Sequence, residues 1–288
     1  MKDSKILVEL KNKTILVTGG AGSIGTFLVK RLLEYPVKTI RVLDIDEHAL
    51  FRLKKSVHDD RIRLLLGSIL DKERIDMAGN NVDIIIHLAA IKNIEISEFN
   101  PMETIDTNIN GLVNLIKMTI QNKPKKFLNV STDKAVEPST LYGTTKQLGE
   151  RLTMWAGQHI FPTKFSSVRL GNVIETRGNV FEIWDEELKN NKPLSITDPK
   201  MKRYFFHIED AVEFILQCIS LTDRGEIFVP KMELHSIKKL SNKISKKHKI
   251  IGIRGEEKII EKLISDEEII RAQNNEKMWI INPKKLSV

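Results

Sequence analysis

The chain has 288 residues, of which 41% are hydrophobic and 29% are charged, a balance typical of a folded globular protein with ample core. Its single cysteine, Cys218, excludes an internal disulfide, and no apolar run is long enough to predict a signal peptide or a membrane span, so we expect a cytoplasmic protein. The net charge of +8 is concentrated in Lys238–Lys249, where the lack of interleaved aromatic residues favours a solvated helix face over a nucleic-acid site.

Apolar stretches with the pattern of strands alternate with amphipathic helical stretches through the first part of the chain. The expected strands are Thr14–Thr18, Thr39–Leu43, Ile62–Leu66, Val82–Leu88, Lys126–Ser131 and Lys164–Arg169. The expected helices are Ser23–Glu34, Glu47–Ser56, Met102–Gln121 and Leu141–Gln158. This alternation favours an α/β fold with a doubly wound parallel sheet of the Rossmann type.

The alternation stops after Asn172, and one late strand is expected at Gly225–Val229. We therefore predict a nucleotide-binding domain in residues 1–170, to which residues 206–230 return. Residues 171–205 and 231–288 are expected to form a smaller C-terminal lobe that binds the substrate.

A glycine-rich turn, Thr-Gly-Gly-Ala-Gly-Ser-Ile-Gly, joins the first expected strand to the first expected helix. Gly19 and Gly22 permit a sharp turn and a close approach of the backbone to a pyrophosphate, and Gly25 permits tight packing of helix on strand. Ser23 and Ile24 open the helix, whose N-terminal N–H groups face the anion. The turn therefore predicts a dinucleotide site.

Asp44 ends the second expected strand, roughly twenty residues after the glycines. A carboxylate there accepts hydrogen bonds from a ribose diol and repels a 2′-phosphate, which favours NAD over NADP. Two alternatives stay open: Asp44 caps the next helix, or the nearby Arg41 and Arg52 permit NADP.

Small residues follow the fourth expected strand and would let the backbone pass close to a flat cofactor. They are Leu88, Ala89 and Ala90. The preceding His87 is expected to be a packed core residue, and Lys92 either contacts a phosphate or is solvated. Asn108 is expected to fix backbone beside the active-site helix.

Polar side chains gather at the end of the fifth expected strand and in the helix after it. Thr132, Asp133 and Lys134 stand where a buried strand gives way to a loop, the edge at which open α/β sheets bind ligands. Tyr142 and Lys146 are one helical turn apart and project from one face. A lysine ammonium beside a phenol favours the phenolate, so Tyr142 is a candidate general base. A solvated helix and an exposed polar loop are the alternatives.

With TGGAGSIG, HLAA and YGTTK in this order, the chain resembles the extended short-chain dehydrogenase/reductases, which act on nucleotide sugars. More narrowly, STDKA, RLGNV, GEIFVPK and IRGEEK resemble the polysaccharide-biosynthesis branch, which contains the inverting UDP-N-acetylglucosamine 4,6-dehydratases. The resemblance covers nearly the whole chain, and the adjacent Asp-Lys pair is its most specific mark.

The resemblance implies roles for five residues. Tyr142 would take the proton from O4 of the sugar, Lys146 would hold the nicotinamide ribose and lower the pKa of the tyrosine, and Thr132 would hydrogen-bond a substrate hydroxyl. After hydride leaves C4, the 4-ketone acidifies the proton on C5. Lys134 would remove that proton, Asp133 would protonate the departing C6 hydroxyl, and the stored hydride would return to C6.

The resemblance also implies a substrate site at positions that hold the nucleotide and its diphosphate. These positions are Asn172, Arg177, Thr197 and Arg203. Arg254 and Glu257 are expected to close over the same pocket, and Lys92 is a further candidate contact. A surface ion pair is the alternative reading of Arg203. Ser68, followed by Ile69, stands where relatives usually carry an aspartate that helps hold adenine.

We therefore predict an NAD-dependent nucleotide-sugar 4,6-dehydratase acting on UDP-N-acetylglucosamine, with NADP as the alternative cofactor. The protein is expected to bind no nucleic acid or membrane and to form a homo-oligomer. A 4- or 5-epimerase of the same sugar nucleotide is the alternative among enzymes, and a non-catalytic NAD(H)-binding regulator is the alternative outside them. The scattered histidines and single cysteine predict no metal site.

Overall fold

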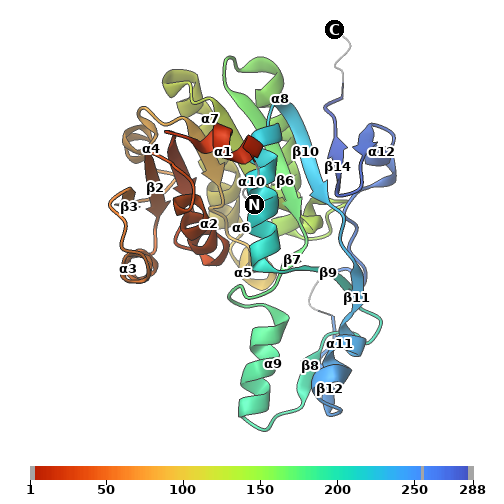
Figure 1. The fold of residues 1–288 in the computed structure, drawn as a ribbon. Coiled ribbons are helices and arrows are strands. Elements are labelled where there is room, and N and C mark those ends of the chain that lie inside the picture. The colour runs from red at the N-terminus through yellow and green to blue at the C-terminus, as the bar shows by residue number, and fades with distance from the viewer. Residues whose placement is uncertain (1–3, 254–255, 285–288) are drawn as a thin grey trace.

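The computed structural model describes residues 4–253 and 256–284. Within them the largest element is a nine-stranded sheet, in the order β13-β14-β10-β6-β5-β4-β1-β2-β3 (Figure 1). Its strands are β1 (Thr14–Thr18), β2 (Thr39–Asp44), β3 (Ile62–Leu66), β4 (Ile84–His87), β5 (Lys126–Thr132), β6 (Lys164–Leu170), β10 (Arg224–Pro230), β13 (Ala272–Asn274) and β14 (Met278–Ile281). The strands from β1 to β6 and β10 are parallel, and β13 and β14 add an antiparallel edge. The expected α/β fold with a doubly wound parallel sheet is confirmed.

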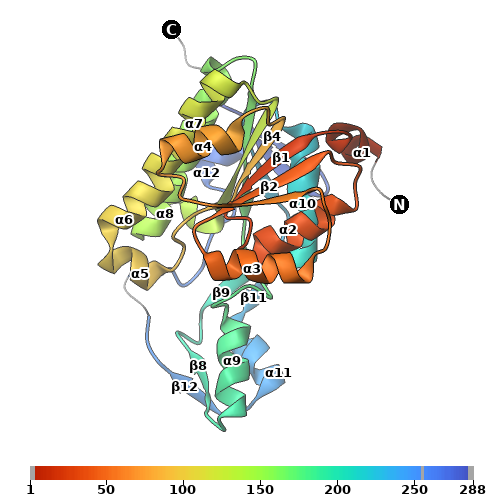
Figure 2. The ribbon, with the colours of Figure 1, turned by 90° about the vertical axis from the view of Figure 1, so that its left-hand side faces the viewer.

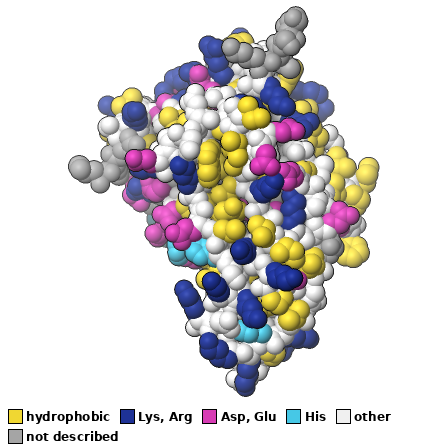
Figure 3. All heavy atoms as spheres, turned by 90° about the vertical axis from the view of Figure 1, so that its right-hand side faces the viewer, with side chains coloured by type: hydrophobic (Ala, Val, Ile, Leu, Met, Phe, Trp, Pro, Cys, Tyr) yellow, Lys and Arg dark blue, Asp and Glu magenta, His cyan; other side chains and the backbone are white. Residues whose placement is uncertain are grey.

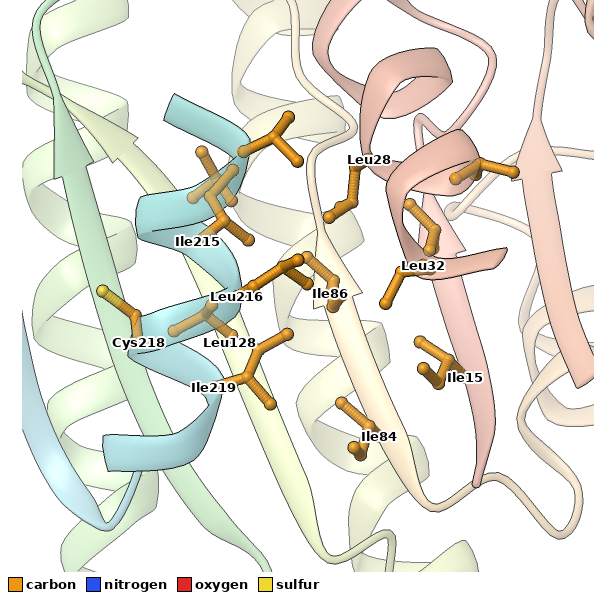
Figure 4. Packing of buried hydrophobic residues seen from close by; sticks show 14 of the residues in the cluster. Ile15, Leu28, Leu32, Ile84, Ile86, Leu128, Ile215, Leu216, Cys218 and Ile219 are labelled. Carbon is orange, nitrogen blue, oxygen red and sulfur yellow. The ribbon is translucent and has the colours of Figure 1, made fainter. Parts of the chain in front are cut away.

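Both faces of the sheet are covered by helices, because the buried strands place apolar residues on both sides. One face carries α1 (Ser4–Leu10), α2 (Ser23–Leu33), α3 (Glu47–Ser56) and α10 (Ile208–Leu221); the other carries α4 (Lys72–Gly79), α7 (Gly111–Asn122) and α8 (Leu141–His159). Along β1, Ile15 faces the first layer and Leu16 the second, as the period of a strand requires. Leu32 and Ile219 meet the sheet from α2 and α10 (Figure 4).

The expected helix over Met102–Gln121 is present, but a π-helical turn lies inside it. After α5 (Ile94–Phe99) the chain forms α6 (Pro101–Ile105), the turn η1 (Asp106–Asn110) and then α7. Asn108 lies inside this turn with its side chain buried. Such turns are frequent at functional sites, where they redirect side chains.

A smaller lobe lies below the main sheet in Figure 2. It contains the helices α9 (Val180–Lys189) and α11 (Ile237–Ile244) and the strands β7 (Asn172–Val173), β8 (Leu194–Ile196), β9 (Lys202–Phe206), β11 (Leu234–Ser236) and β12 (His248–Ile250). Trp184, Leu194 and Ile237 belong to its own apolar core. Lysine and arginine side chains are spread over this lobe, in the lower part of Figure 3.

The expected assignment of residues 231–288 to the smaller lobe is wrong for their last part. After the short helix α12 (Asp266–Ile269), β13 and β14 return to the main sheet and extend it beyond β10. Ile281 is fully buried there and packs with Ile227 and Val229 of β10. The return therefore buries apolar surface at a sheet edge that would otherwise be open.

No helix in the two described ranges is long and apolar enough to cross a membrane. The cytoplasmic location stays a prediction.

Candidate active site

The backbone of the glycine-rich turn packs directly against the backbone that follows β4. Gly19 has φ +67°, and a Cβ atom on it would lie 2.6 Å from the backbone nitrogen of Ala89. A Cβ atom on Gly25 would lie 2.6 Å from the Gly19 carbonyl oxygen. Side chains are therefore excluded at Gly19 and Gly25, beside the N-terminus of α2. This geometry fits the pyrophosphate of a dinucleotide.

Asp44 holds the glycine-rich turn by accepting two backbone hydrogen bonds. Its Oδ2 accepts from the nitrogen of Ala21 at 3.0 Å, and its Oδ1 accepts from the nitrogen of Asp46 at 3.1 Å. The alternative that Asp44 caps the next helix is wrong, because Asp46 caps α3 at 2.8 Å. Arg41 donates to carbonyls at the end of α4, and Arg52 lies 3.9 Å from Asp46.

A cavity of about 400 Å³ lies between the carboxyl ends of the main strands and the smaller lobe. It brings together residues expected in three separate roles, namely Ile24, Leu88, Ala90, Lys92, Thr132, Lys134, Tyr142, Lys146, Asn172, Arg177, Thr197, Arg203 and Glu257. Other expected site residues do not line it, namely Asp133 of the catalytic set and Gly19, Gly22, Ser23, Gly25, Asp44, Ser68, Ile69, Ala89 and Asn108 of the cofactor set. Arg254 lies outside the described residues.

Ser68 and Ile69 have structural contacts after β3. The Ser68 hydroxyl accepts from the nitrogen of Leu70 at 3.1 Å, and Ile69 is buried where a Cβ atom on Gly111 would lie 2.4 Å from its Cδ1. Their contact with a cofactor stays a prediction.

Asp133 and Lys134 form an ion pair at the cavity, which Lys134 lines and Asp133 does not. The Lys134 Nζ lies 3.0 Å from the Asp133 Oδ1 and also donates to the Asn172 Oδ1 at 3.1 Å. Asp133 is fully buried and accepts a second hydrogen bond from the Thr132 hydroxyl at 3.0 Å. Its Oδ2 is buried without a partner in the described part of the chain. The alternative of an exposed polar loop is wrong.

Burial raises the pKa of the Tyr142 phenol, and this effect outweighs the lowering effects of Lys134 and the Thr132 side chain. Lys134 is therefore a cation that favours the phenolate of Tyr142. The lowering of this pKa by Lys146 stays a prediction. The solvated-helix alternative is wrong, because Lys146 is only 7% exposed.

Lys146 is a buried ammonium group with no hydrogen-bond acceptor among the described residues. Burial lowers its pKa to about 8, against a smaller raising effect of Glu150 one turn along α8. His87 lies nearby with its Nδ1 2.7 Å from the Thr18 hydroxyl, and burial lowers its pKa to about 3. The expectation that His87 is a packed, neutral core residue is confirmed.

Asn108 ties the loop after β4 to α8. Its Oδ1 accepts from the nitrogen of Ile91 at 2.8 Å, and its Nδ2 donates to the Ile91 carbonyl at 2.9 Å and to the Thr145 hydroxyl at 3.0 Å. The expectation that Asn108 fixes backbone is confirmed. A contact of Asn108 with the cofactor stays a prediction.

The loop carrying Arg177 lies over the start of α2. The backbone nitrogen of Arg177 donates to the Ser23 hydroxyl at 3.1 Å, and the Lys92 Nζ donates to the Arg177 carbonyl at 3.3 Å. Burial and the Arg177 charge lower the pKa of Lys92. Lys92 therefore lines the cavity while its side chain remains exposed, and its contact with a phosphate stays a prediction.

Arg203 pins the late segment to β9. Its guanidinium pairs with the Glu257 carboxylate at 2.8 Å and donates to the carbonyls of Lys258 and Ile259 at 2.8 and 3.0 Å. Arg203 is 4% exposed, so the alternative of a surface ion pair is wrong. Both members of this pair line the cavity.

Sequence reasoning missed one acidic residue of this region, Glu261. It is 3% exposed, and it interacts electrostatically with Lys134 and Asp133. Glu261 lies in the largely apolar segment Ile-Ile-Glu-Lys-Leu-Ile. Burying an unpaired charge costs free energy, so a carboxylate in this segment was the one signal in the sequence that could have identified Glu261.

Comparisons with known proteins agree with this site. The family model described as polysaccharide biosynthesis protein matches residues 15–283. A Campylobacter jejuni protein named UDP-N-acetylglucosamine 4,6-dehydratase (inverting) is 38% identical over 94% of this chain and 83% of its own. A Rickettsia bellii protein named UDP-glucose 4-epimerase is 34% identical over 91% of this chain and 81% of its own. The X-ray structure of Pen from Bacillus thuringiensis matches with a TM-score of 0.92 at 32% sequence identity. The match covers 96% of this chain and 90% of that chain. The chain belongs to the polysaccharide biosynthesis protein family of the extended short-chain dehydrogenase/reductases.

Proposed function

We propose that this protein is an NAD-dependent nucleotide-sugar 4,6-dehydratase whose substrate is UDP-N-acetylglucosamine. The observation that carries the proposal is the buried Asp133–Lys134 ion pair, whose lysine lines the same cavity as Tyr142 and Lys146. Tyrosine and lysine suffice for oxidation and reduction at one carbon, whereas loss of water needs a second acid and base. The relative from Campylobacter jejuni, named for this reaction, supports the assignment.

The cofactor assignment follows from the glycine-rich turn and from Asp44. The turn and the N-terminus of α2 would hold the pyrophosphate, Asp44 would accept from a ribose diol, and Lys146 would donate to the second ribose. NAD, when bound, supplies reversible acceptance of hydride. Asp44 disfavours a 2′-phosphate, so NAD is preferred and NADP is the alternative.

Tyr142 would act at O4 of the sugar. Its phenol is protonated in this buried setting, and Lys134 and Thr132 both favour the phenolate. A phenolate formed beside these groups would take the O4 proton, and Thr132 would donate to the same hydroxyl oxygen. Lys146, whose pKa is about 8, would remain protonated near neutral pH.

The Asp133–Lys134 pair contains the acid and the base in one unit. Moving one proton along the 3.0 Å hydrogen bond converts carboxylate and ammonium into carboxylic acid and amine, with no change in proton count. The amine would then take the C5 proton while the acid protonates the departing C6 hydroxyl, and water leaves. The pair is then back in its ionic form, and the turnover closes when hydride returns to C6 and a proton is delivered to C5, balanced by the one that Tyr142 took from O4.

The smaller lobe would bind the nucleotide. Asn172, Thr197 and Arg203 line the cavity on its side, and Arg177 lies where the loop meets α2. Arg203 donates four hydrogen bonds within the protein, three to the late segment and one to the Lys202 carbonyl, so we assign it chiefly to holding that segment in place. Arg177, whose guanidinium has no hydrogen-bond acceptor among the described residues, is the stronger candidate for the diphosphate.

An epimerase of the same sugar nucleotide is the second candidate, and the relative from Rickettsia bellii favours it. A 4-epimerase returns hydride to the opposite face of C4 and requires no acid at C6. The buried Asp133 would then have no chemical task, although burying a carboxylate is costly.

The test is to incubate the protein with UDP-N-acetylglucosamine and NAD and to determine the mass and stereochemistry of the product. Loss of one water supports the dehydratase. Unchanged mass with an inverted centre would establish an epimerase, and a lack of turnover with intact NAD binding would leave a cofactor-binding regulator.

We also propose that the protein forms a homo-oligomer. Large apolar side chains are exposed on the neighbouring helices α5, α6 and α8, namely Ile96, Phe99, Met102 and Leu148. Phe99 is 85% exposed, an unfavourable position for a solvated surface. Light scattering on the purified protein tests this: Phe99→Asp should convert an oligomer into a monomer, and a monomeric parent protein would refute the proposal.

A further inference from the structure

Glu261 is a buried carboxylate to which the proposed reaction assigns no task. It is 3% exposed, and its Oε2 has no hydrogen-bond partner in the described residues. Burying a carboxylate without hydrogen bonds is unfavourable unless nearby charges offset the cost. Its surroundings must therefore explain why it is there.

The segment that carries Glu261 is fastened to the loop that follows Lys134. The Ser139 hydroxyl donates to the Glu256 carbonyl at 2.6 Å, and the Lys258 Nζ donates to the Val136 carbonyl at 2.7 Å. The Lys262 Nζ pairs with the Glu137 carboxylate at 2.9 Å. These three contacts join residues 256–262 to residues 136–139 on both sides of Glu261.

A second set of contacts fixes the same segment to β9. The backbone nitrogen of Lys202 donates to the Ile259 carbonyl at 2.9 Å, and Arg203 donates to that carbonyl at 3.0 Å. Lys202 and Ile260 also form an isolated parallel bridge. The backbone on both sides of Glu261 is thus fixed to the loop after Lys134 and to β9, and the buried carboxylate is close enough to interact electrostatically with Asp133 and Lys134.

The charges around this pair come from several elements. Glu261 interacts with Lys134, Asp133, Arg203 and Lys258. Lys134 interacts in addition with Lys92 and Tyr142. Burial alone lowers the pKa of Lys134, but Asp133 and Glu261 raise it and the net direction is upward. In the proposed reaction Asp133 exchanges a proton with the sugar, whereas Glu261 does not.

We propose that Glu261 is a positioning residue that keeps the proton shared by Asp133 and Lys134 within the site. This inference rests on the proposed dehydratase reaction. The pair needs one shared proton, because Asp133 can act as an acid only if that proton remains available. Arg203 and the burial of the site both favour losing the proton from Lys134 to solvent. Burial also raises the pKa of Glu261, and in its ionised form Glu261 opposes the loss of the proton from Lys134.

The first experiment needs no substrate. Lysine side chains labelled with ¹⁵N are titrated by NMR in the full-length protein, and the Lys134 resonance is identified by its loss in Lys134→Arg. In Glu261→Gln the titration midpoint of Lys134 should fall by about one pH unit, because a nearby opposite charge has been removed. The matched control is Glu256→Gln, which removes a charge from an exposed position of the same segment and should leave the midpoint unchanged.

The second experiment measures water loss as a function of pH. The alkaline limb of the profile should move to lower pH in Glu261→Gln by the same amount, while NAD binding stays as in the parent protein. An unchanged Lys134 midpoint in Glu261→Gln overturns the inference. If the parent protein loses no water from the sugar, the proposed function fails, and the NMR titration still decides the role of Glu261.

A third pair of variants guards against misfolding. Glu261→Asp and Glu261→Asn have side chains of equal size and differ in charge. If Glu261→Gln does not fold, the Lys134 midpoint should be higher in Glu261→Asp than in Glu261→Asn. Equal midpoints in these two variants would show that Glu261 fills space and has no electrostatic role.

Discussion

The Lys134 Nζ lies 3.0 Å from the Asp133 Oδ1, at the carboxyl end of a strand whose seven residues are all buried. The side chains are 15% and 0% exposed, so the pair is largely removed from water. Breaking a buried pair by removing one partner leaves an uncompensated charge. The two residues therefore act as a unit, and substitutions at either one should affect the same chemical step.

Replacing Lys134 by alanine should preserve NAD binding and lower the rate of water loss by about 10³-fold, because the base for C5 is removed. Product formation is followed by mass spectrometry and NAD binding by fluorescence titration. Lys239→Ala, an exposed lysine on α11, is the control and should be fully active. Full activity of Lys134→Ala would refute the assignment.

Replacing Lys146 by methionine should abolish turnover and stabilise the fold by up to about 3.5 kcal/mol at pH 7, because each pKa unit is worth about 1.4 kcal/mol. The pKa of Lys146 is lowered from 10.5 to about 8 by burial, so the folded state holds its proton less tightly than the unfolded state. The destabilisation is complete below about pH 8 and disappears as the pH rises to about 10.5. Urea unfolding at several pH values measures this.

Lys126 provides the contrast, since it is equally buried but has acceptors. Its Nζ donates to the Ile219 carbonyl at 2.8 Å and pairs with Glu9 at 2.9 Å. Lys126→Met should therefore destabilise the protein, by about 1–3 kcal/mol, because these acceptors lose their partner. Equal effects of the Lys126 and Lys146 substitutions would contradict the argument.

Replacing Gly19 by alanine should destabilise the protein by about 2 kcal/mol or more and weaken NAD binding at least about tenfold. A Cβ atom there would lie 2.6 Å from the Ala89 nitrogen, and φ is +67°. Gly22→Ala is the graded comparison, because φ is −68° and the nearest atom to a new Cβ is 3.2 Å away. Calorimetric NAD titration and thermal unfolding should rank Gly19→Ala as the more severe change.

Replacing Asp44 by asparagine should weaken NAD binding and reduce the preference for NAD over NADP by about tenfold. Asparagine keeps one side-chain acceptor for the backbone N–H groups of Ala21 and Asp46 but loses the charge that repels a 2′-phosphate. Titration of both cofactors against both proteins measures the ratio. Tighter NADP than NAD binding by the parent protein would overturn the role given to Asp44.

Local sequence patterns predicted the strands from β1 to β6 with small errors at their ends, together with the glycine-rich turn and α8. They succeeded because strand and helix periods are set by neighbours along the chain. Local patterns did not predict the π-helical turn inside the helix Met102–Gln121. Asn108 in this turn bonds Ile91 and Thr145, and no local pattern specifies partners that far away in the chain.

The sequence by itself determined which chemical groups this protein possesses. The glycines that can hold a phosphate, and the acid and base that precede Tyr142, are recognised from residue type and spacing alone. The tertiary structure decided the environment of those groups. Burial raises the pKa of Tyr142, Arg203 is enclosed by the late segment, and Glu261 lies beside a pair far away in the chain. The solvation of a side chain and its interactions with charges distant in the sequence depend on which segments pack together, and this packing exists only in the folded chain.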